Sequence, residues 1–128
     1  MEKIRNYMAE SLLSIGPTAN ILEATHIMHD NEVHSLLVEE NGEYIGIITN
    51  HDISRKMVAE DLDPEKMLVA EVMSFPLLKL ESQESMEKAA KIMRDHCVHH
   101  LAVTEHGQML GILSITDYHK YMVKKHPR

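Results

Sequence analysis

Apolar positions along the chain change their spacing several times, and each change predicts a different element. An apolar run at 12–15 ends at Gly16 and Pro17, which predicts a short strand. From Thr18 to Met28 apolar side chains recur at intervals of three and four residues. That interval is typical of a helix with one buried face.

Two further apolar runs, 33–38 and 44–48, are separated by Asn41 and Gly42. Both turn residues accept positive φ at low cost, so the two runs are predicted to form a hairpin. Helical spacing follows over 53–62. The predicted order is therefore strand, helix, strand, strand, helix. The first strand must cross over to rejoin the hairpin, which favours an α+β fold: a small mixed sheet with helices on one face.

The whole pattern returns 65 positions later. The stretch GIITNHD that begins at Gly46 reappears as GILSITD at Gly111. The offset also pairs identical residues far from this motif: Met8 with Met73, Ala24 with Ala89, Met28 with Met93, His34 with His99, Val38 with Val103, and Gly42 with Gly107. The chain is therefore predicted to be a duplication, with repeats at 1–62 and 63–128 packed as a pseudo-two-fold pair. Either repeat alone would be marginally stable.

A short amphipathic helix is expected ahead of the first strand of each repeat. In 1–11 the apolar side chains are spaced by three and four residues. In 64–73, Asp63 is placed to cap the helix and Pro64 occupies the first turn, where proline is tolerated.

Composition narrows the class of protein. The 128 residues are 44% hydrophobic, which suits a globular protein with a core. A net charge of −7 argues against binding to a nucleic-acid polymer. The single cysteine, Cys97, fits a reducing compartment, and neither a signal peptide nor a membrane-spanning run is visible. We expect a cytoplasmic protein that does not enter a membrane.

The repeated motif places a hydroxyl three residues before a carboxylate, where a strand gives way to a helix. The pairs are Thr49 with Asp52 and Ser114 with Asp117. The free N–H groups and dipole at a helix N-terminus favour a phosphate, and a carboxylate can accept hydrogen bonds from ribose hydroxyls. The alternative is that both aspartates only cap their helices, and the two roles are compatible.

Basic side chains near these motifs could meet phosphates, although a solvated surface is the usual role of each taken singly. They are His51, Arg55, Lys56, Lys79 and Lys120.

Histidines gather around Cys97, but His99 and His100 lie in a predicted strand, where neighbouring side chains point to opposite faces. No metal site is therefore expected. The two aspartates are equivalent copies, without the different environments that an acid and a base require, so no enzyme is expected.

The whole chain resembles a tandem pair of cystathionine-β-synthase (CBS) domains, the arrangement called a Bateman module. The resemblance rests on the two GI(I/L)(T/S)xxD motifs, the hairpin before each, the Met73-Ser74 entry to the second copy, and the run ITNHDISRKM at 48–57. The family often has arginine where this chain has His51, and proline where it has Leu37 and Ala102.

The resemblance implies a regulatory module that binds an adenosine compound in a cleft between the repeats and signals to a partner protein. AMP, ADP and ATP are the first candidates, ahead of S-adenosylmethionine and NAD. The ligand-binding residues it implies are Ser114, Thr116, Asp117, Thr49 and Asp52, with backbone near Ile15-Gly16 and Leu80-Glu81 holding adenine. It also implies a homodimer and no required cofactor. The alternative is a structural homodimerisation module with degenerate, empty clefts.

Overall fold

The computed structural model describes residues 2–127, which form two compact units. The first-repeat unit is the continuous segment Leu13–Leu77. The second-repeat unit joins the segment up to Leu12 to the segment from Leu78 onward. The compact units are therefore not the two sequence repeats taken end to end, because the start of the chain packs with the second repeat.

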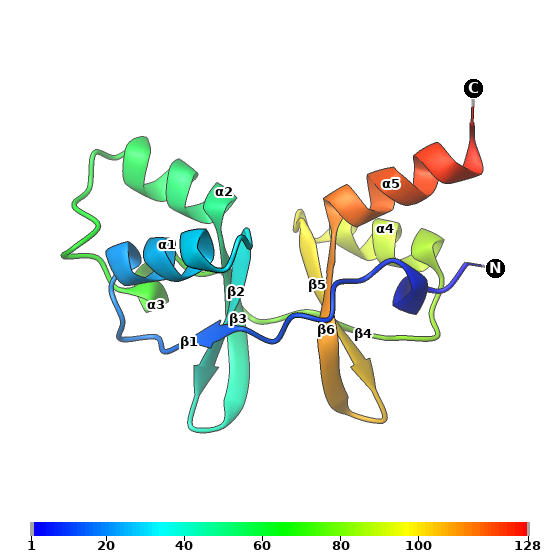
Figure 1. Cartoon of the computed structure of the whole chain (residues 1–128), viewed down its shortest axis with the longest axis horizontal. Helices are drawn as coiled ribbons and strands as arrows, with labels where there is room; N and C mark the ends of the chain where they lie inside the picture. Colours follow the sequence, from blue (N-terminus) through cyan, green and yellow to red (C-terminus); the bar gives the residue numbers. More distant parts are fainter. Residues whose placement is uncertain (1, 128) are drawn as a thin grey trace. The chain divides into compact units, whose positions relative to one another are not determined.

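In each unit the elements follow the order predicted from the sequence (Figure 1). Those of the first-repeat unit are β1 (Ser14–Ile15), α1 (Ile21–Asp30), β2 (Ser35–Glu40), β3 (Glu43–Thr49), α2 (Asn50–Ile53), the π-helical turn η2 (Ser54–Val58) and α3 (Val69–Val72). Those of the second-repeat unit are the 3₁₀ turn η1 (Ile4–Asn6), β4 (Lys79–Glu81), α4 (Met86–Asp95), β5 (His100–Glu105), β6 (Gln108–Ser114) and α5 (Ile115–Lys125).

Each unit contains one three-stranded mixed sheet. In the order β1-β2-β3, β1 is parallel to β2 and β3 is antiparallel to it. The order β4-β5-β6 repeats that arrangement. Both hairpin turns have positive φ at both central positions: 52° and 82° at Asn41 and Gly42, and 52° and 78° at His106 and Gly107. The predicted hairpins and the mixed sheets are confirmed.

The core of each unit lies between one face of its sheet and its helices. In the first-repeat unit, Leu36 and Val38 share one sheet face and pack in a cluster with Met28 of α1, Met57 of η2 and Val69 of α3. The equivalent cluster of the second-repeat unit contains residues from α4, β5, β6 and α5. It also includes Ile4 of η1. The prediction of an α+β fold with helices on one face is confirmed.

The short helices differ from the prediction. The helix expected over 1–11 is only a 3₁₀ turn at Ile4–Asn6, and the helix expected over 64–73 is reduced to Val69–Val72. Before α3 the chain is held extended by a β-bridge between Asn20 and Leu68. The Asp63 side chain accepts from the N–H of Glu65 at 2.9 Å, so it stabilises a turn and does not cap a helix.

The helix expected over 53–62 begins earlier and ends earlier than predicted. It starts at Asn50, changes to a π-helical turn at Ser54 and ends at Val58. Its end is fixed by Asp61, which has a φ of 51°, and by the N–H of Leu62, which donates to the carbonyl of Met57 at 2.9 Å. The equivalent α5 runs unbroken over Ile115–Lys125.

Candidate functional site

Both repeated motifs form a reciprocal cap at the start of the last helix of their repeat. The N–H of Asp52 donates to Thr49 Oγ1 at 3.0 Å, and the N–H of Thr49 donates to Asp52 Oδ2 at 3.1 Å. At α5 the N–H of Asp117 donates to Ser114 Oγ at 3.1 Å, and the N–H of Ser114 donates to Asp117 Oδ2 at 2.8 Å. The capping role considered from the sequence is thus observed in both copies.

These caps leave hydrogen-bonding capacity for a ligand. Each hydroxyl acts in the cap only as an acceptor, so the cap does not consume its O–H donor. Each carboxylate uses one oxygen in the cap, and an ionised carboxylate offers about four lone-pair positions. A cap and a ligand contact can therefore coexist at Ser114 and Asp117, which are partly buried. In the other copy Thr49 is only 6% exposed, so Asp52 is the more accessible member of that pair.

The glycine that opens each motif is required by close packing. A Cβ on Gly46 would lie 2.7 Å from the carbonyl oxygen of Ser74, and a Cβ on Gly111 would lie 2.0 Å from that of Ala9. In each unit an extended segment therefore crosses the third strand at the glycine. That segment follows β3 along the chain in the first-repeat unit and comes long before β6 in the second-repeat unit. The same segment pairs with the residue after the glycine, Ser74 with Ile47 and Ala9 with Ile112.

Asp52 is a candidate residue that lines a cavity together with basic side chains. With Arg55, Lys56, Glu60 and Val72 it lines a cavity of about 260 Å³. Lys56 Nζ lies 3.6 Å from Glu60 Oε2, with both side chains about half exposed. The structure thus brings together Asp52, Arg55 and Lys56 of the residues proposed from the sequence. His51 is exposed beside them.

In the second-repeat unit Thr116 and Lys120 are exposed near the start of α5, while Ser114 and Asp117 are partly buried. Thr116 occupies the position equivalent to His51, and Lys120 the position equivalent to Arg55. The candidate residues of this unit thus present the same kinds of group with one fewer cation, since the position of Lys56 is taken by Tyr121.

The backbone positions proposed for adenine lie away from the motif of their own unit. Ile15 pairs with Val38, whereas Thr49 pairs with Ser35, three residues along β2 and on its other side. At about 3.3 Å per residue and about 4.8 Å between strands, the separation is roughly 14 Å. The same register separates Leu80 from Ser114. A ligand that touched both positions within one unit would have to be elongated.

Gly16 has an open backbone. A Cβ there would meet no atom within 4 Å, unlike at Gly46 and Gly111. Ile15 and Leu80 bury their side chains, being 6% and 8% exposed, so only their backbone could face a ligand. Lys79 and Glu81, on either side of Leu80, are exposed.

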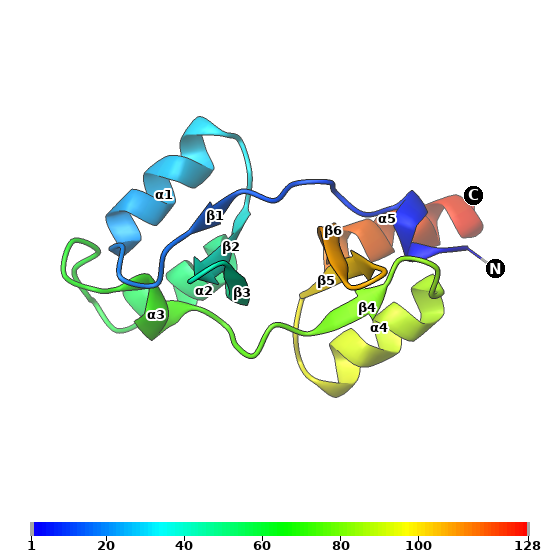
Figure 2. The same cartoon turned by 90° about the horizontal axis from the view of Figure 1, so that it is seen from below.

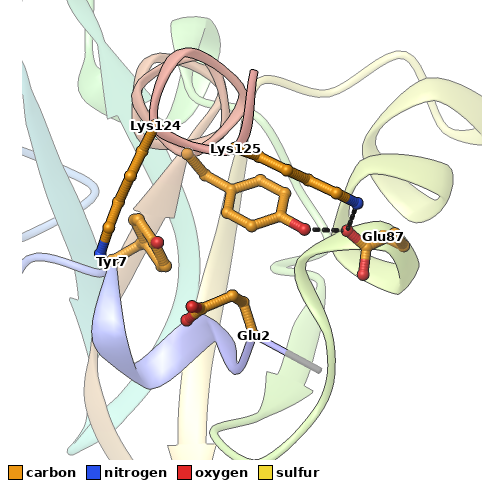
Figure 3. Close-up of a pocket in the computed structure, with 6 residues that line it drawn as sticks. Glu2, Tyr7, Glu87, Lys124 and Lys125 are labelled. Carbon is orange, nitrogen blue, oxygen red and sulfur yellow. Dashed lines mark hydrogen bonds and ion pairs between the residues drawn. The ribbon is translucent and has the colours of Figure 1, made fainter. Parts of the chain in front are cut away.

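A second cavity, of about 310 Å³, lies in the second-repeat unit between η1, α4 and α5 (Figure 3). Its walls are Glu2, Tyr7, Glu87, Tyr121, Lys124 and Lys125. The Tyr121 hydroxyl donates to Glu87, and Lys125 Nζ lies 3.6 Å from the same carboxylate oxygen. The rings of Tyr7 and Tyr121 meet edge to face at 5.3 Å, with Lys124 Nζ 5.7 Å from the Tyr7 ring centre.

The groups of this cavity shift one another's titration. The Tyr121 hydrogen bond lowers the pKa of Glu87, with a further contribution from the Lys125 charge. In return the Glu87 carboxylate raises the pKa of Tyr121. The pKa of Lys125 is raised, chiefly by Tyr121 and then by Glu87. These three side chains satisfy one another and join α4 to α5. Sequence reasoning missed the cluster, since Glu87 reads as an ordinary exposed helical position.

Within residues 2–127, no group of three or more His, Cys, Asp or Glu side chains is arranged to hold a metal ion. The same part of the chain contains no helix long and apolar enough to cross a membrane.

Sequence reasoning also missed a contact at Ser74, whose hydroxyl donates to Asp52 Oδ1 at 3.2 Å. Its only signal was the position of Ser74 in the Met73-Ser74 entry.

Comparison with known proteins bears on the whole chain. The sequence profile of the CBS domain matches twice, at residues 4–59 and 69–124. The CBS domain-containing protein YhcV of Bacillus subtilis is 27% identical over 117 residues, covering 91% of this chain and 83% of that protein. An uncharacterized protein of Methanopyrus kandleri is 29% identical over 104 residues, and there the chain spans 53% of its relative's length.

Solved structures agree on the fold. The hexameric CBS-CP12 protein from bloom-forming cyanobacteria has a TM-score of 0.88 at 25% identity, covering 100% of this chain and 76% of that one. An uncharacterized conserved protein from Pyrococcus horikoshii has a TM-score of 0.82 at 25% identity, covering 95% of both chains. Proteins with paired CBS domains are generally regulatory, non-catalytic modules. With a CBS profile matching each repeat, this chain belongs to the CBS-domain family and carries two CBS domains in tandem.

Proposed function

We propose that the chain binds an adenosine-containing ligand, such as AMP, ADP or ATP, and passes that signal to a partner protein. The observation that carries this proposal is the cavity shared by Asp52, Arg55 and Lys56. A carboxylate there can accept from vicinal ribose hydroxyls, while two cations face the phosphates. An adenosine nucleotide carries both groups, and membership of a generally regulatory family supports the same reading.

The second-repeat unit offers a second candidate site at Ser114, Thr116 and Asp117, with Lys120 one turn along α5. Backbone at Ile15-Gly16 and at Leu80 is proposed to hold adenine. S-adenosylmethionine is a less favoured ligand because it has no phosphate to meet the two cations, and NAD is proposed after the mononucleotides. The proposed function requires no cofactor.

A second candidate function is a structural homodimerisation module whose clefts bind nothing. It is favoured by the caps, because holding the start of a helix is a sufficient reason for both aspartates. The related CBS-CP12 protein is hexameric, which supports self-association as a role for such modules.

Thermal unfolding with and without millimolar AMP, ADP, ATP, S-adenosylmethionine and NAD separates the two functions. A ligand that binds only the folded state at about 100 times its dissociation constant adds about 2.7 kcal/mol of stability. We expect a raised midpoint with at least one adenine nucleotide. No shift with any of the five compounds would refute ligand sensing.

The site is tested with Asp117→Asn and Asp52→Asn. Asparagine keeps an oxygen that can accept the cap hydrogen bond but removes the charge, so the fold should survive while ligand stabilisation falls. Sedimentation of the same proteins measures self-association. Dimers that persist in all variants without any ligand shift would support the structural module.

A further inference from the structure

The two units contain an equivalent backbone bridge at the residue that follows the glycine of each motif. In the first-repeat unit the N–H of Ser74 donates to the carbonyl of Ile47 at 2.8 Å, and the N–H of Ile47 donates back at 3.0 Å. In the second-repeat unit Ala9 and Ile112 exchange the same two hydrogen bonds at 2.9 Å each. Ser74 and Ala9 are also separated by the repeat offset of 65 positions.

At this bridge the units differ by one hydroxyl group. The Ser74 hydroxyl donates to Asp52 Oδ1 at 3.2 Å, on the oxygen that the cap does not use. Ala9 has a methyl group at the equivalent place, so it makes no such bond to Asp117. The Asp52 carboxylate therefore accepts at both oxygens within the protein, whereas the cap of α5 uses only Oδ2 of Asp117.

We propose that the Ser74 hydroxyl competes with the ligand for Asp52 and makes the two ligand sites unequal. This inference rests on the proposed function, because it concerns the carboxylates taken to accept from ribose. A vicinal diol donates two hydrogen bonds, and at Asp52 one of the two acceptor positions of Oδ1 is already taken by the Ser74 hydroxyl. At Asp117 the bridge residue is Ala9, which has no hydroxyl, so Oδ1 can accept from the diol without competition from that residue.

Ser74 acts as a competitor and not as a support for Asp52. The carboxylate is already oriented by the N–H of Thr49 at 3.1 Å, and Asp117 is oriented by the equivalent bond from the N–H of Ser114, with no hydroxyl at position 9. Removing the Ser74 hydroxyl therefore releases an acceptor without releasing the side chain. Hydrogen bonds to charged groups are stronger than neutral ones, so displacing this one has a measurable cost.

The test exchanges the two residues and reads each site separately. Ser74→Ala is made in an Asp117→Asn background, so that the site of the first-repeat unit is measured alone. Ala9→Ser is made in an Asp52→Asn background, which isolates the other site. Calorimetric titration uses AMP and ATP, each beside its 2′-deoxy counterpart, which lacks one of the two donors.

We expect Ser74→Ala to tighten ribonucleotide binding by about threefold to tenfold and Ala9→Ser to weaken it by a similar factor. The preference for the ribo over the 2′-deoxy compound should rise in the first variant and fall in the second. An effect of the substitution on the fold alone would change the affinities for the ribo and the 2′-deoxy compound by the same factor.

Three results would overturn the inference. Unchanged affinities in both exchanges would show that the hydroxyl does not compete, and the proposed function would stand. Weaker binding in Ser74→Ala would make Ser74 a support for Asp52, again without touching the proposed function. Absence of binding by the wild-type protein and by all variants would refute the proposed function, and this inference with it.

Discussion

At Gly111 the packing leaves no space for a side chain. Its missing Cβ would lie 2.0 Å from the Ala9 carbonyl oxygen and 3.0 Å from the Ala9 carbonyl carbon, both of which belong to backbone. Neither atom can move away like the end of a flexible side chain. The glycine of the motif thus allows the N-terminal segment to cross β6 closely enough for Ala9 to pair with Ile112.

We predict that Gly111→Ala lowers the free energy of unfolding by about 1–3 kcal/mol or more, the usual cost of overpacking. Gly46→Ala should cost less, because its closest contact is longer, 2.7 Å. Gly16→Ala is the matched control, since its added methyl meets no atom within 4 Å. Urea unfolding of the three variants measures the order. A Gly111→Ala protein as stable as Gly16→Ala would contradict the packing described.

Residue-scale chemistry was predicted from the sequence where it is local. Thr49 and Asp52 are three residues apart, so their placement follows from the strand-to-helix change, as it does for Ser114 and Asp117. The Ser74 contact joins residues 22 positions apart. It depends on where an extended segment crosses β3, and no spacing in the sequence specifies that crossing.

Among the elements, α4 and α5 are tied by the hydrogen bond from Tyr121 to Glu87 (Figure 3). The Tyr121 side chain is 3% exposed and its ring also packs on Tyr7, so replacement by phenylalanine removes the hydroxyl and retains the packing. The bond lowers the pKa of Glu87 below its ordinary value of 4.5. A carboxyl with a lowered folded pKa stabilises the fold above its unfolded pKa, and that contribution is lost as pH falls through the folded value.

We predict that Tyr121→Phe lowers the thermal midpoint modestly at pH 7 and that the difference from wild type shrinks as pH falls through the range below about 4.5. The comparison with Glu87→Gln and the double variant isolates the pairwise contribution. Unfolding followed at several pH values measures it. A difference independent of pH would mean that the hydroxyl stabilises the protein without involving the charge of Glu87.

Long periodic elements were predicted well and short ones poorly. The helices of ten residues, α1 and α4, and both hairpins follow from spacing and from turn residues that accept positive φ. The turns at 4–6 and 69–72 contain too few residues for a period to fix their type or limits. The π-helical turn at Ser54–Val58 had no sequence signal, because its side chains fit helical spacing equally well.

For the whole molecule, the boundaries of the compact units differ from the boundaries of the sequence repeats. The segment Leu13–Leu77 is a complete unit, and its core includes Val69 and Val72, which are 0% and 8% exposed. A fragment cut at the repeat boundary, residues 1–62, lacks both side chains. Ile4, fully buried, belongs to the core of the other unit.

We predict that fragment 13–77 shows a cooperative thermal transition and dispersed amide resonances, whereas fragment 1–62 shows neither. The two fragments have similar lengths, so the low stability expected of any small domain affects both equally. A difference between them therefore reports the contribution of residues 63–77, which only fragment 13–77 contains. Equal behaviour of the two fragments would show that the contacts of α3 contribute little to the core.

The division also bears on synthesis. Figure 2 shows the N-terminal segment beside β4 and α5, and Ile4 donates its N–H to the carbonyl of Glu84 at 2.9 Å. Ile4 is synthesised before Leu13–Leu77, but the core that buries it is completed only after all of that segment has been made. At about 5–20 residues per second this delay is several seconds. The segment around Ile4 is therefore translated before the first-repeat unit but buried only after it, and during that delay a chaperone or another nascent chain can reach its apolar side chains.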